Sequence, residues 1–154
     1  MRKKVVMAFG TFDILHPGHL SYFSRAKSLG DKLIVVVSRD SSASASKGRR
    51  PLMNEKERLK IIAALRIADV AVLGNKFSTS DEKYRIIKRY MPDVIALGYD
   101  QKVNLDDLRD FLKRNKSRAK IIRLTKPYKA RSSKSSLIRR KMMKAIRPQG
   151  RRVP

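Results

Sequence analysis

The segment from residue 10 to residue 19 reads Gly10-Thr11-Phe12-Asp13-Ile14-Leu15-His16-Pro17-Gly18-His19. The apolar run before it, residues 4–9, predicts a buried parallel strand. After it, Pro17 opens a helix that we expect to continue to Leu29, because proline is favoured in the first turn of a helix. The segment is therefore a tight connection between a strand and a helix.

This connection has the chemistry of an anion site. Gly10 lets a ligand approach the backbone, and the amides of Gly18 and His19 are exposed at the start of the helix. His16 and His19 are the two histidines of the chain, and their spacing places both on one side of the first helical turn. They can donate hydrogen bonds to phosphoryl oxygens. A purely structural role for the pair and a zinc site are weaker alternatives, the latter because no third or fourth ligand follows nearby.

The rest of the sequence alternates strands and helices. Apolar runs predict further strands over 32–37, 70–73, 93–97 and 120–124. Helical periodicity predicts helices over 55–65 and from residues 80, 104 and 135 or 136, with Asn54, Ser80 and Asn104 as N-caps. The Ser-rich, basic stretch 38–54 predicts a mobile loop. We expect an α/β fold, a single doubly wound domain over 1–146 with a five-stranded parallel Rossmann-like sheet, and a disordered basic tail over 147–154.

Parallel sheets bind ligands outside the carboxyl ends of their strands. In the predicted order of elements, that rule selects four loops, namely residues 10–18, 38–54, 98–102 and 125–136. The polar residues that could carry chemistry fall almost entirely within these loops. Their coincidence with the ligand-binding edge of the sheet indicates an enzyme.

Charge is distributed unevenly along the 154 residues, which carry a net charge of +25. All 13 acidic residues lie at or before Asp110, whereas residues 111–154 hold 17 Lys and Arg and no acid. The positive electrostatic field of such a segment attracts polyanions, so a basic nucleic-acid-binding protein is one alternative. That alternative does not explain the two histidines in one turn.

The composition also excludes some classes of site. The absence of cysteine excludes thiol catalysis and Cys-ligated zinc. No apolar run reaches the roughly 18 to 20 residues that span a bilayer, and no signal-peptide pattern opens the chain. We therefore expect a soluble cytoplasmic protein without a membrane partner.

The pattern Gly-Thr-Phe-Asp-x-x-His-x-Gly-His resembles the signature of the cytidylyltransferase-like superfamily of nucleotidyltransferases, which have a HUP-type fold. The resemblance extends over residues 3–146. It implies that Thr11 and Phe12 contact the nucleotide, that residues 16–19 hold its phosphates, and that His16 and His19 are catalytic. Related adenylyltransferases for nicotinamide mononucleotide begin with Gly-Arg-Phe-Gln-Pro, so the chain resembles a different branch.

The same resemblance implies roles for several basic residues. Lys27 matches a catalytic position near the phosphates, with a solvated helix lysine as the alternative. Lys47 and Arg49, followed by Arg50, match a flexible loop that closes over the triphosphate. Arg58 matches a residue that grips substrate phosphate, and the alternative is an exposed ion pair with the neighbouring Glu55.

Two later segments resemble the archaeal FAD synthases. These are Leu97-Gly98-Tyr99-Asp100-Gln101 and the Ser-rich turn over 132–136, which departs from the Arg-Thr-x-Gly-Ile-Ser-Thr-Thr segment of glycerol-3-phosphate cytidylyltransferases. The implied ATP-binding residues are Thr11, Phe12, His16, Pro17, Gly18, His19, Asp100, Tyr128, Ser133 and Ser135.

The resemblance implies transfer of AMP from ATP to FMN, which gives FAD and pyrophosphate. Magnesium would arrive with ATP and needs no protein ligand, and a homodimer is expected from the relatives. CTP with glycerol 3-phosphate or another sugar or alcohol phosphate stays open, because the chain has few aromatic residues and no Trp to cover a flavin. We do not expect a nucleic-acid partner.

Overall fold

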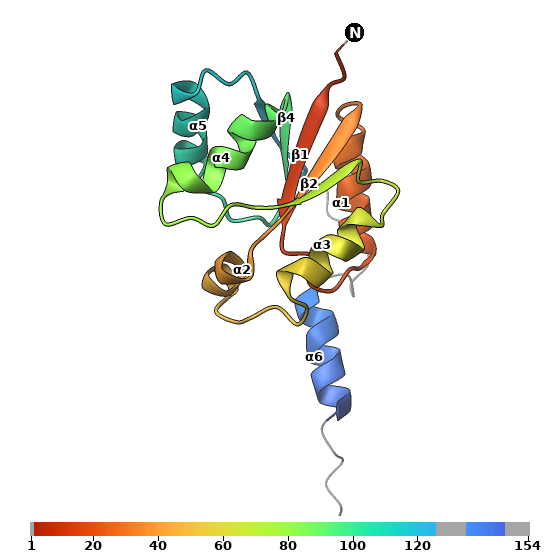
Figure 1. Ribbon diagram of the computed structural model, residues 1–154. Coiled ribbons are helices and arrows are strands. Elements are labelled where there is room, and N and C mark those ends of the chain that lie inside the picture. Colours follow the sequence, from red (N-terminus) through yellow and green to blue (C-terminus); the bar gives the residue numbers. More distant parts are fainter. Residues whose placement is uncertain (1, 126–134, 147–154) are drawn as a thin grey trace, which may run out of the picture.

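Five parallel strands form one sheet with the order β3-β2-β1-β4-β5 in the computed structural model, which describes residues 2–125 and 135–146 (Figure 1). The strands are β1 (Val5–Gly10), β2 (Lys32–Val37), β3 (Val70–Leu73), β4 (Val94–Leu97) and β5 (Lys120–Arg123). This sheet confirms the predicted fold class. The predicted tail over 147–154 and the candidate residues Tyr128 and Ser133 lie outside the described residues.

Helices cover both faces of the sheet. They are α1 (Pro17–Lys27), α2 (Asp40–Lys47), α3 (Glu55–Ala63), α4 (Ser80–Tyr90), α5 (Leu105–Arg114) and α6 (Ser135–Ile146). In Figure 1, α1 and α3 lie on one side of the strands and α4 and α5 on the other. Each side has its own apolar core, one around Phe12 and Phe23 and the other around Met7, Tyr84 and Phe111.

The strand pairing of β1 shows where ligands are expected to bind at the edge of the sheet. β1 pairs with β2 through Ala8↔Val35 and with β4 through Ala8↔Ala96, so the chain leaves β1 toward one side and later returns to its other side. The order of the strands reverses there, and ligands bind parallel sheets at such a switch point. Gly10, the last residue of β1, lies at this switch point.

The prediction of a loop over 38–54 was wrong for its first half, where α2 forms over Asp40–Lys47. Asp40 lies in the first turn, where a carboxylate stabilises the helix dipole, and Gly48 ends the helix in the left-handed region at φ 65°. Ala43 anchors the helix by burial. The sequence hid this helix because serines have only moderate helix propensity and provide no apolar stripe.

The predicted N-caps are largely confirmed. Asn54 accepts hydrogen bonds from two amides of α3 in a capping box with Glu57, and the side chain of Asn104 likewise accepts from two amides of α5. The cap of α4 is Thr79 and not Ser80, which is the first helical residue. Side chains that satisfy the free amides of a helix start fix where the helix begins.

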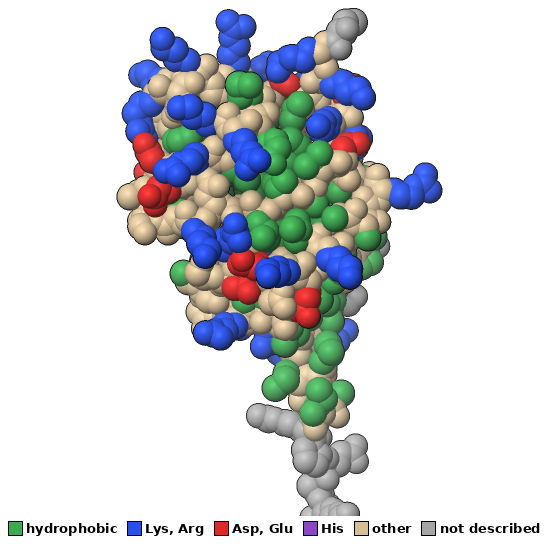
Figure 2. All heavy atoms as spheres, viewed as in Figure 1, with side chains coloured by type: hydrophobic (Ala, Val, Ile, Leu, Met, Phe, Trp, Pro, Cys, Tyr) green, Lys and Arg blue, Asp and Glu red, His purple; other side chains and the backbone are tan. Residues whose placement is uncertain are grey.

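Basic side chains are spread over much of the face shown in Figure 2, whereas acidic ones gather in few places. The last helix, α6, projects beyond the sheet and exposes Met142, Met143 and Ile146. Among the helices that the structure describes, none is both long and apolar enough to cross a membrane.

Gly10 is required by the close approach of Phe12. A Cβ at residue 10 would overlap the ring carbons of Phe12. That residue is buried, with 4% of its surface exposed, and its ring packs against Phe23 with 4.9 Å between the ring centroids. The backbone of Phe12 lies at φ 52°, so its ring is held over Gly10 by an unusual turn.

We expect Gly10→Ala to lower the free energy of unfolding by about 1–3 kcal/mol, because the added methyl group forces Phe12 out of its packed position. Urea denaturation followed by circular dichroism measures this loss.

Gly74→Ala is the matched control, since Gly74 follows β3 directly as Gly10 ends β1, and its added Cβ would meet its nearest neighbours at 3.6 Å. The control should change stability by less than about 0.5 kcal/mol. Equal losses in the two variants would contradict the packing argument.

Candidate active site

A cavity of about 1050 Å³ opens at the carboxyl ends of the central strands. All four loops selected from the sequence contribute to its wall, for example through Thr11, Lys47, Asp100 and Ser136. Its volume is at the upper limit of small-molecule sites, so it has room for more than one substrate. The site predicted from the order of the elements is therefore assembled by the fold.

The two histidines form a stacked pair at the start of α1. Their ring centroids lie 3.8 Å apart at an interplanar angle of 24°, and the edge of the Phe12 ring contacts His19. Within residues 2–125 and 135–146, the buried Nδ1 atoms of both rings have no hydrogen-bond partner. Buried polar atoms are rarely left without a partner, so these atoms point to a bound ligand.

Burial keeps both imidazoles neutral at pH 7. It lowers the pKa of His19 to about 3, with the adjacent His16 and the positive charge of Lys47 acting in the same direction. Burial also lowers the pKa of His16, while the Asp100 carboxylate acts in the opposite direction. Each neutral ring therefore offers one N–H donor to a ligand.

The first turn of α1 offers fewer amides than we predicted. The His19 amide donates to the His16 carbonyl at 2.9 Å, so it is not available to an anion. Pro17 has no N–H. The Gly18 amide donates no hydrogen bond within the described chain, and neither a capping side chain nor an acidic residue occupies the first turn. The helix start therefore offers an anion the Gly18 amide and the positive end of the helix dipole.

Three basic residues at the end of α2 and in the loop after it line the same cavity. They are Lys47, Arg49 and Arg50. Burial lowers the pKa of Lys47, and repulsion from Arg49 lowers it further. An anionic ligand would relieve this repulsion.

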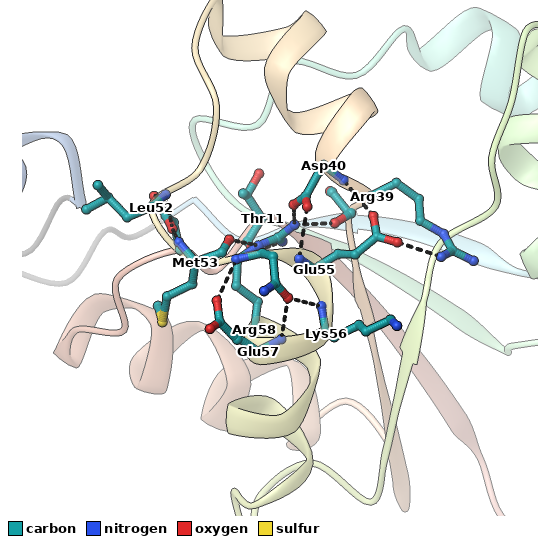
Figure 3. A network of polar contacts seen from close by, with 12 residues as sticks. Thr11, Arg39, Asp40, Leu52, Met53, Glu55, Lys56, Glu57 and Arg58 are labelled. Atoms are coloured by element: carbon teal, nitrogen blue, oxygen red, sulfur yellow. Dashed lines mark hydrogen bonds and ion pairs between the residues drawn. The ribbon is translucent and has the colours of Figure 1, made fainter.

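Arg58 does not line the cavity, although we predicted that it grips substrate phosphate. Its side chain is fully buried and donates to the carbonyls of Met53 (3.0 Å), Thr11 (2.5 Å) and Ser38 (2.8 Å), as Figure 3 shows. The guanidinium also pairs with Asp40 at 2.6 Å. These bonds occupy four of the five N–H groups of an arginine, so Arg58 binds the protein itself.

The alternative ion pair of Arg58 with Glu55 does not form either. Glu55 pairs with Arg39 at 2.8 Å and accepts a hydrogen bond from the Asp40 amide. Arg39 also donates to the Gly74 carbonyl at 2.7 Å and thereby joins the end of β3 to this network.

Asp13 attaches the second loop to the first. Its carboxylate is buried and accepts hydrogen bonds from the amides of Leu52 (2.8 Å) and Met53 (3.0 Å). Asp13 belongs to the segment 10–19, but its partner Met53 is 40 residues away in the chain and could not be predicted from that segment.

Lys27 lies away from the cavity, so the structure does not bring it to the predicted catalytic set. Its ammonium donates to the Asp31 carbonyl at 2.6 Å and pairs with Asp69. Lys27 is the last residue of α1 and lies about 12 Å along the helix from His19.

Two residues that line the cavity, Gln101 and Tyr22, and Arg123 beside it had no role predicted from the sequence. Gln101 joins β4 to β1, since its amide accepts from the Gly98 backbone and donates to the Phe9 carbonyl. The buried Tyr22 hydroxyl donates to the Ala96 carbonyl at 2.9 Å, and Arg123 donates to the Gln101 carbonyl at 3.0 Å. Only Gln101 had a signal, as part of the segment after β4.

The other predicted residues have the following positions. Thr11, Phe12, Gly18 and Asp100 line the cavity, although Phe12 is largely a core residue. Ser135 is the first residue of α6, and the next residue, Ser136, lines the cavity.

Comparison with known proteins finds relatives over most of the chain. A family profile described as cytidylyltransferase-like matches residues 7–141. An FAD synthase from Thermoplasma acidophilum is 41% identical over 92% of this chain and 95% of its own length, and one from Thermococcus sibiricus is 38% identical over 94% and 97%. The crystal structure of a lipopolysaccharide core biosynthesis protein from Thermoplasma volcanium is 38% identical, covers 82% of this chain and 99% of its own, and has a TM-score of 0.74.

We expect Arg58→Met to lower the free energy of unfolding by about 3 kcal/mol or more, because three carbonyls and the Asp40 carboxylate lose their donor. Arg109→Met is the control, since Arg109 makes an exposed i, i+3 ion pair with Asp106. Chemical denaturation of both variants measures the difference, and a loss as small as that of the control would exclude Arg58 as the link between these loops.

We expect the His19 side chain to become protonated only at acid pH. Because its pKa is lowered from the ordinary histidine value of 6.5 to about 3, the folded protein binds fewer protons than the unfolded chain in this range. The stability that His19 contributes is therefore lost as pH falls from 6.5 toward 3. NMR titration of the two imidazoles, assigned with His16→Ala, should give His19 a midpoint near 3. A midpoint of about 6 or higher for His19, close to that of a solvated imidazole, would contradict its burial.

Proposed function

The chain belongs to the cytidylyltransferase-like family of nucleotidyltransferases, and we propose that it acts as an FAD synthase that transfers AMP from ATP to FMN. The observation that carries this proposal is the 41% identity to a protein named FAD synthase over nearly the full length of both chains. The stacked, neutral histidine pair beside a basic loop supports the same chemistry.

The reaction joins two phosphates. An oxygen of the FMN phosphate attacks the α-phosphorus of ATP, the bond from that phosphorus to the oxygen that bridges it to the β-phosphate breaks, and pyrophosphate leaves. A phosphate monoester is already anionic near neutral pH, so no strong general base is needed. The protein therefore contributes position and charge stabilisation.

The histidine pair supplies the donors at the reacting phosphate. Neutral His16 and His19 would each donate one hydrogen bond to phosphoryl oxygens, and the Gly18 amide would add a third donor. Because the two rings are already stacked and His19 packs against Phe12, they need little reorganisation as charge develops in the transition state.

The basic loop would hold the rest of the triphosphate. Lys47, Arg49 and Arg50 line the same cavity as the histidines and would stabilise the pyrophosphate as it leaves. Asp100 would take a ribose hydroxyl or a base amine, and Thr11 would contact the nucleotide as well. Roles for Tyr128, Ser133 and Ser135 at the nucleotide stay predictions, as do a homodimer and a cytoplasmic location.

A divalent cation would enter this site with the substrate. The described residues contain no group of three or more His, Asp or Glu side chains that could hold a metal ion. Magnesium bound to ATP phosphates would neutralise charge on the leaving group. The chain's own residues would then position the phosphates around it.

A sugar or alcohol phosphate is the second candidate for the substrate that accepts the nucleotide. The Thermoplasma volcanium protein of known structure is named for lipopolysaccharide core biosynthesis, which keeps a sugar phosphate as a second candidate acceptor. That candidate uses the same histidines and basic loop, with CTP and glycerol 3-phosphate or another sugar or alcohol phosphate as substrates.

Four incubations of the protein with magnesium separate these candidates. Each of ATP and CTP is paired once with FMN and once with glycerol 3-phosphate. We expect FAD and pyrophosphate from ATP with FMN, measured by chromatography, and no product from CTP. A cytidylylated alcohol and no FAD would select the second candidate.

His16→Ala and His19→Ala should each reduce turnover by about 100-fold or more, as for the loss of one donor to an oxyanion. Lys27→Ala is a matched control from the same helix, because its ammonium lies away from the cavity, and it should retain most activity once its folding is verified. Near-normal FAD formation by both histidine variants would exclude the assigned role.

A further inference from the structure

The cavity has two chemically different ends. One end holds the histidine pair and the basic loop, as described above. The other end extends between the sheet and the two helices α4 and α5, where its wall includes Tyr84, Ile87 and Leu108. These three residues belong to the apolar core of the α4–α5 side, whereas Phe12 at the phosphate end belongs to the core of the opposite side.

The apolar end carries an aromatic and cationic cluster at its rim. Phe77, in the loop after β3, is 40% exposed and lines the cavity. The Lys83 ammonium lies 5.8 Å from the centroid of the Phe77 ring and 5.3 Å from that of Tyr84. Over residues 2–125 and 135–146, no ion pair joins Lys83 to a carboxylate, so its charge is available to a ligand.

This cluster has the composition of a site for a planar, electron-poor ring. An exposed phenyl ring provides a stacking surface, and an ammonium beside it favours a ring edge that carries partial negative charge. The side-chain amide of Asn75, which lines the same cavity, donates to the Glu82 carbonyl at 2.8 Å and leaves its oxygen as an acceptor. Stacking surface, cation and acceptor together match an isoalloxazine ring.

We propose that this end of the cavity, formed by Phe77, Lys83, Tyr84 and Asn75, binds the isoalloxazine ring of FMN. The ring stacks on Phe77, Lys83 faces the C2 carbonyl and N1, and the Asn75 oxygen accepts from N3–H. The ribityl chain then leads the phosphate toward the histidine pair, since both ends belong to one cavity. The inference rests on the proposed function, and it gives the flavin an aromatic contact in a chain that has few aromatic residues.

The nucleotide is assigned to the other side on the basis of topology. Asp100 follows β4 and Ser136 comes after β5, whereas Phe77 follows β3 at the opposite edge of the sheet. An acceptor ring that enters from the β3 side therefore leaves the β4–β5 side to the nucleoside.

Phe77→Ala and Lys83→Gln test the ring site in the full-length protein. We expect the KM for FMN to rise about 10-fold in Phe77→Ala and about 3-fold or more in Lys83→Gln, while the KM for ATP changes less than about 2-fold. Ile61→Ala and Lys88→Gln are the matched controls. Ile61 has a similar exposed fraction of 36% on α3, and Lys88 is exposed on α4; neither lines the cavity.

Riboflavin provides a readout that does not depend on turnover, because it carries the ring and ribityl chain without the phosphate. Quenching of its fluorescence by the unaltered protein should saturate, and Phe77→Ala should weaken binding about 10-fold without loss of the folded circular dichroism spectrum. His16→Ala should leave riboflavin binding within about 2-fold, since the histidines lie at the other end and donate to phosphate.

The outcomes separate this inference from the proposed function. If the unaltered protein makes no FAD, the proposed function fails. If it makes FAD while both variants keep an unchanged KM for FMN, or while riboflavin does not bind, the ring site is wrong. A rise in the KM for ATP alone would place the nucleotide base at Phe77 and would also overturn the inference.

Discussion

The guanidinium of Arg58 donates hydrogen bonds to backbone carbonyls that follow β1 and β2 and precede α3, and it pairs with Asp40 at the start of α2. A buried cation is costly unless its donors are satisfied, so these segments are held in the one arrangement that satisfies it. Asp13 reinforces the arrangement by accepting the Leu52 and Met53 amides. The phosphate end of the cavity depends on this constraint, although Arg58 itself does not reach the cavity.

The histidine pair illustrates how a fold prepares a site before a ligand arrives. Stacking between His16 and His19 and the contact of Phe12 fix both rings, and burial holds them neutral by lowering the pKa of each. In the proposed reaction, the cationic loop would attract the polyphosphate and the two neutral histidines would orient the reacting group.

Charge and shape together explain why one cavity can serve two substrates. The end beside Lys47 and Arg49 is cationic, and the end beside Tyr84 and Leu108 is apolar. The central β1 lies between them, with the core of one sheet face behind each end. A strand order that reverses at β1 therefore brings two binding environments to a common point of reaction.

The sequence alone determined the parallel sheet, the four site loops and the histidine turn, because apolar periodicity and the turn residues Gly10 and Pro17 are local signals. It did not reveal α2, whose serines lack an apolar stripe. The positions of Arg58 and Lys27 were decided by tertiary structure, since their partners Thr11 and Asp69 are distant in the chain. Local sequence sets which residue types are present, whereas burial and long-range hydrogen bonds determine whether a basic side chain faces a ligand or the protein.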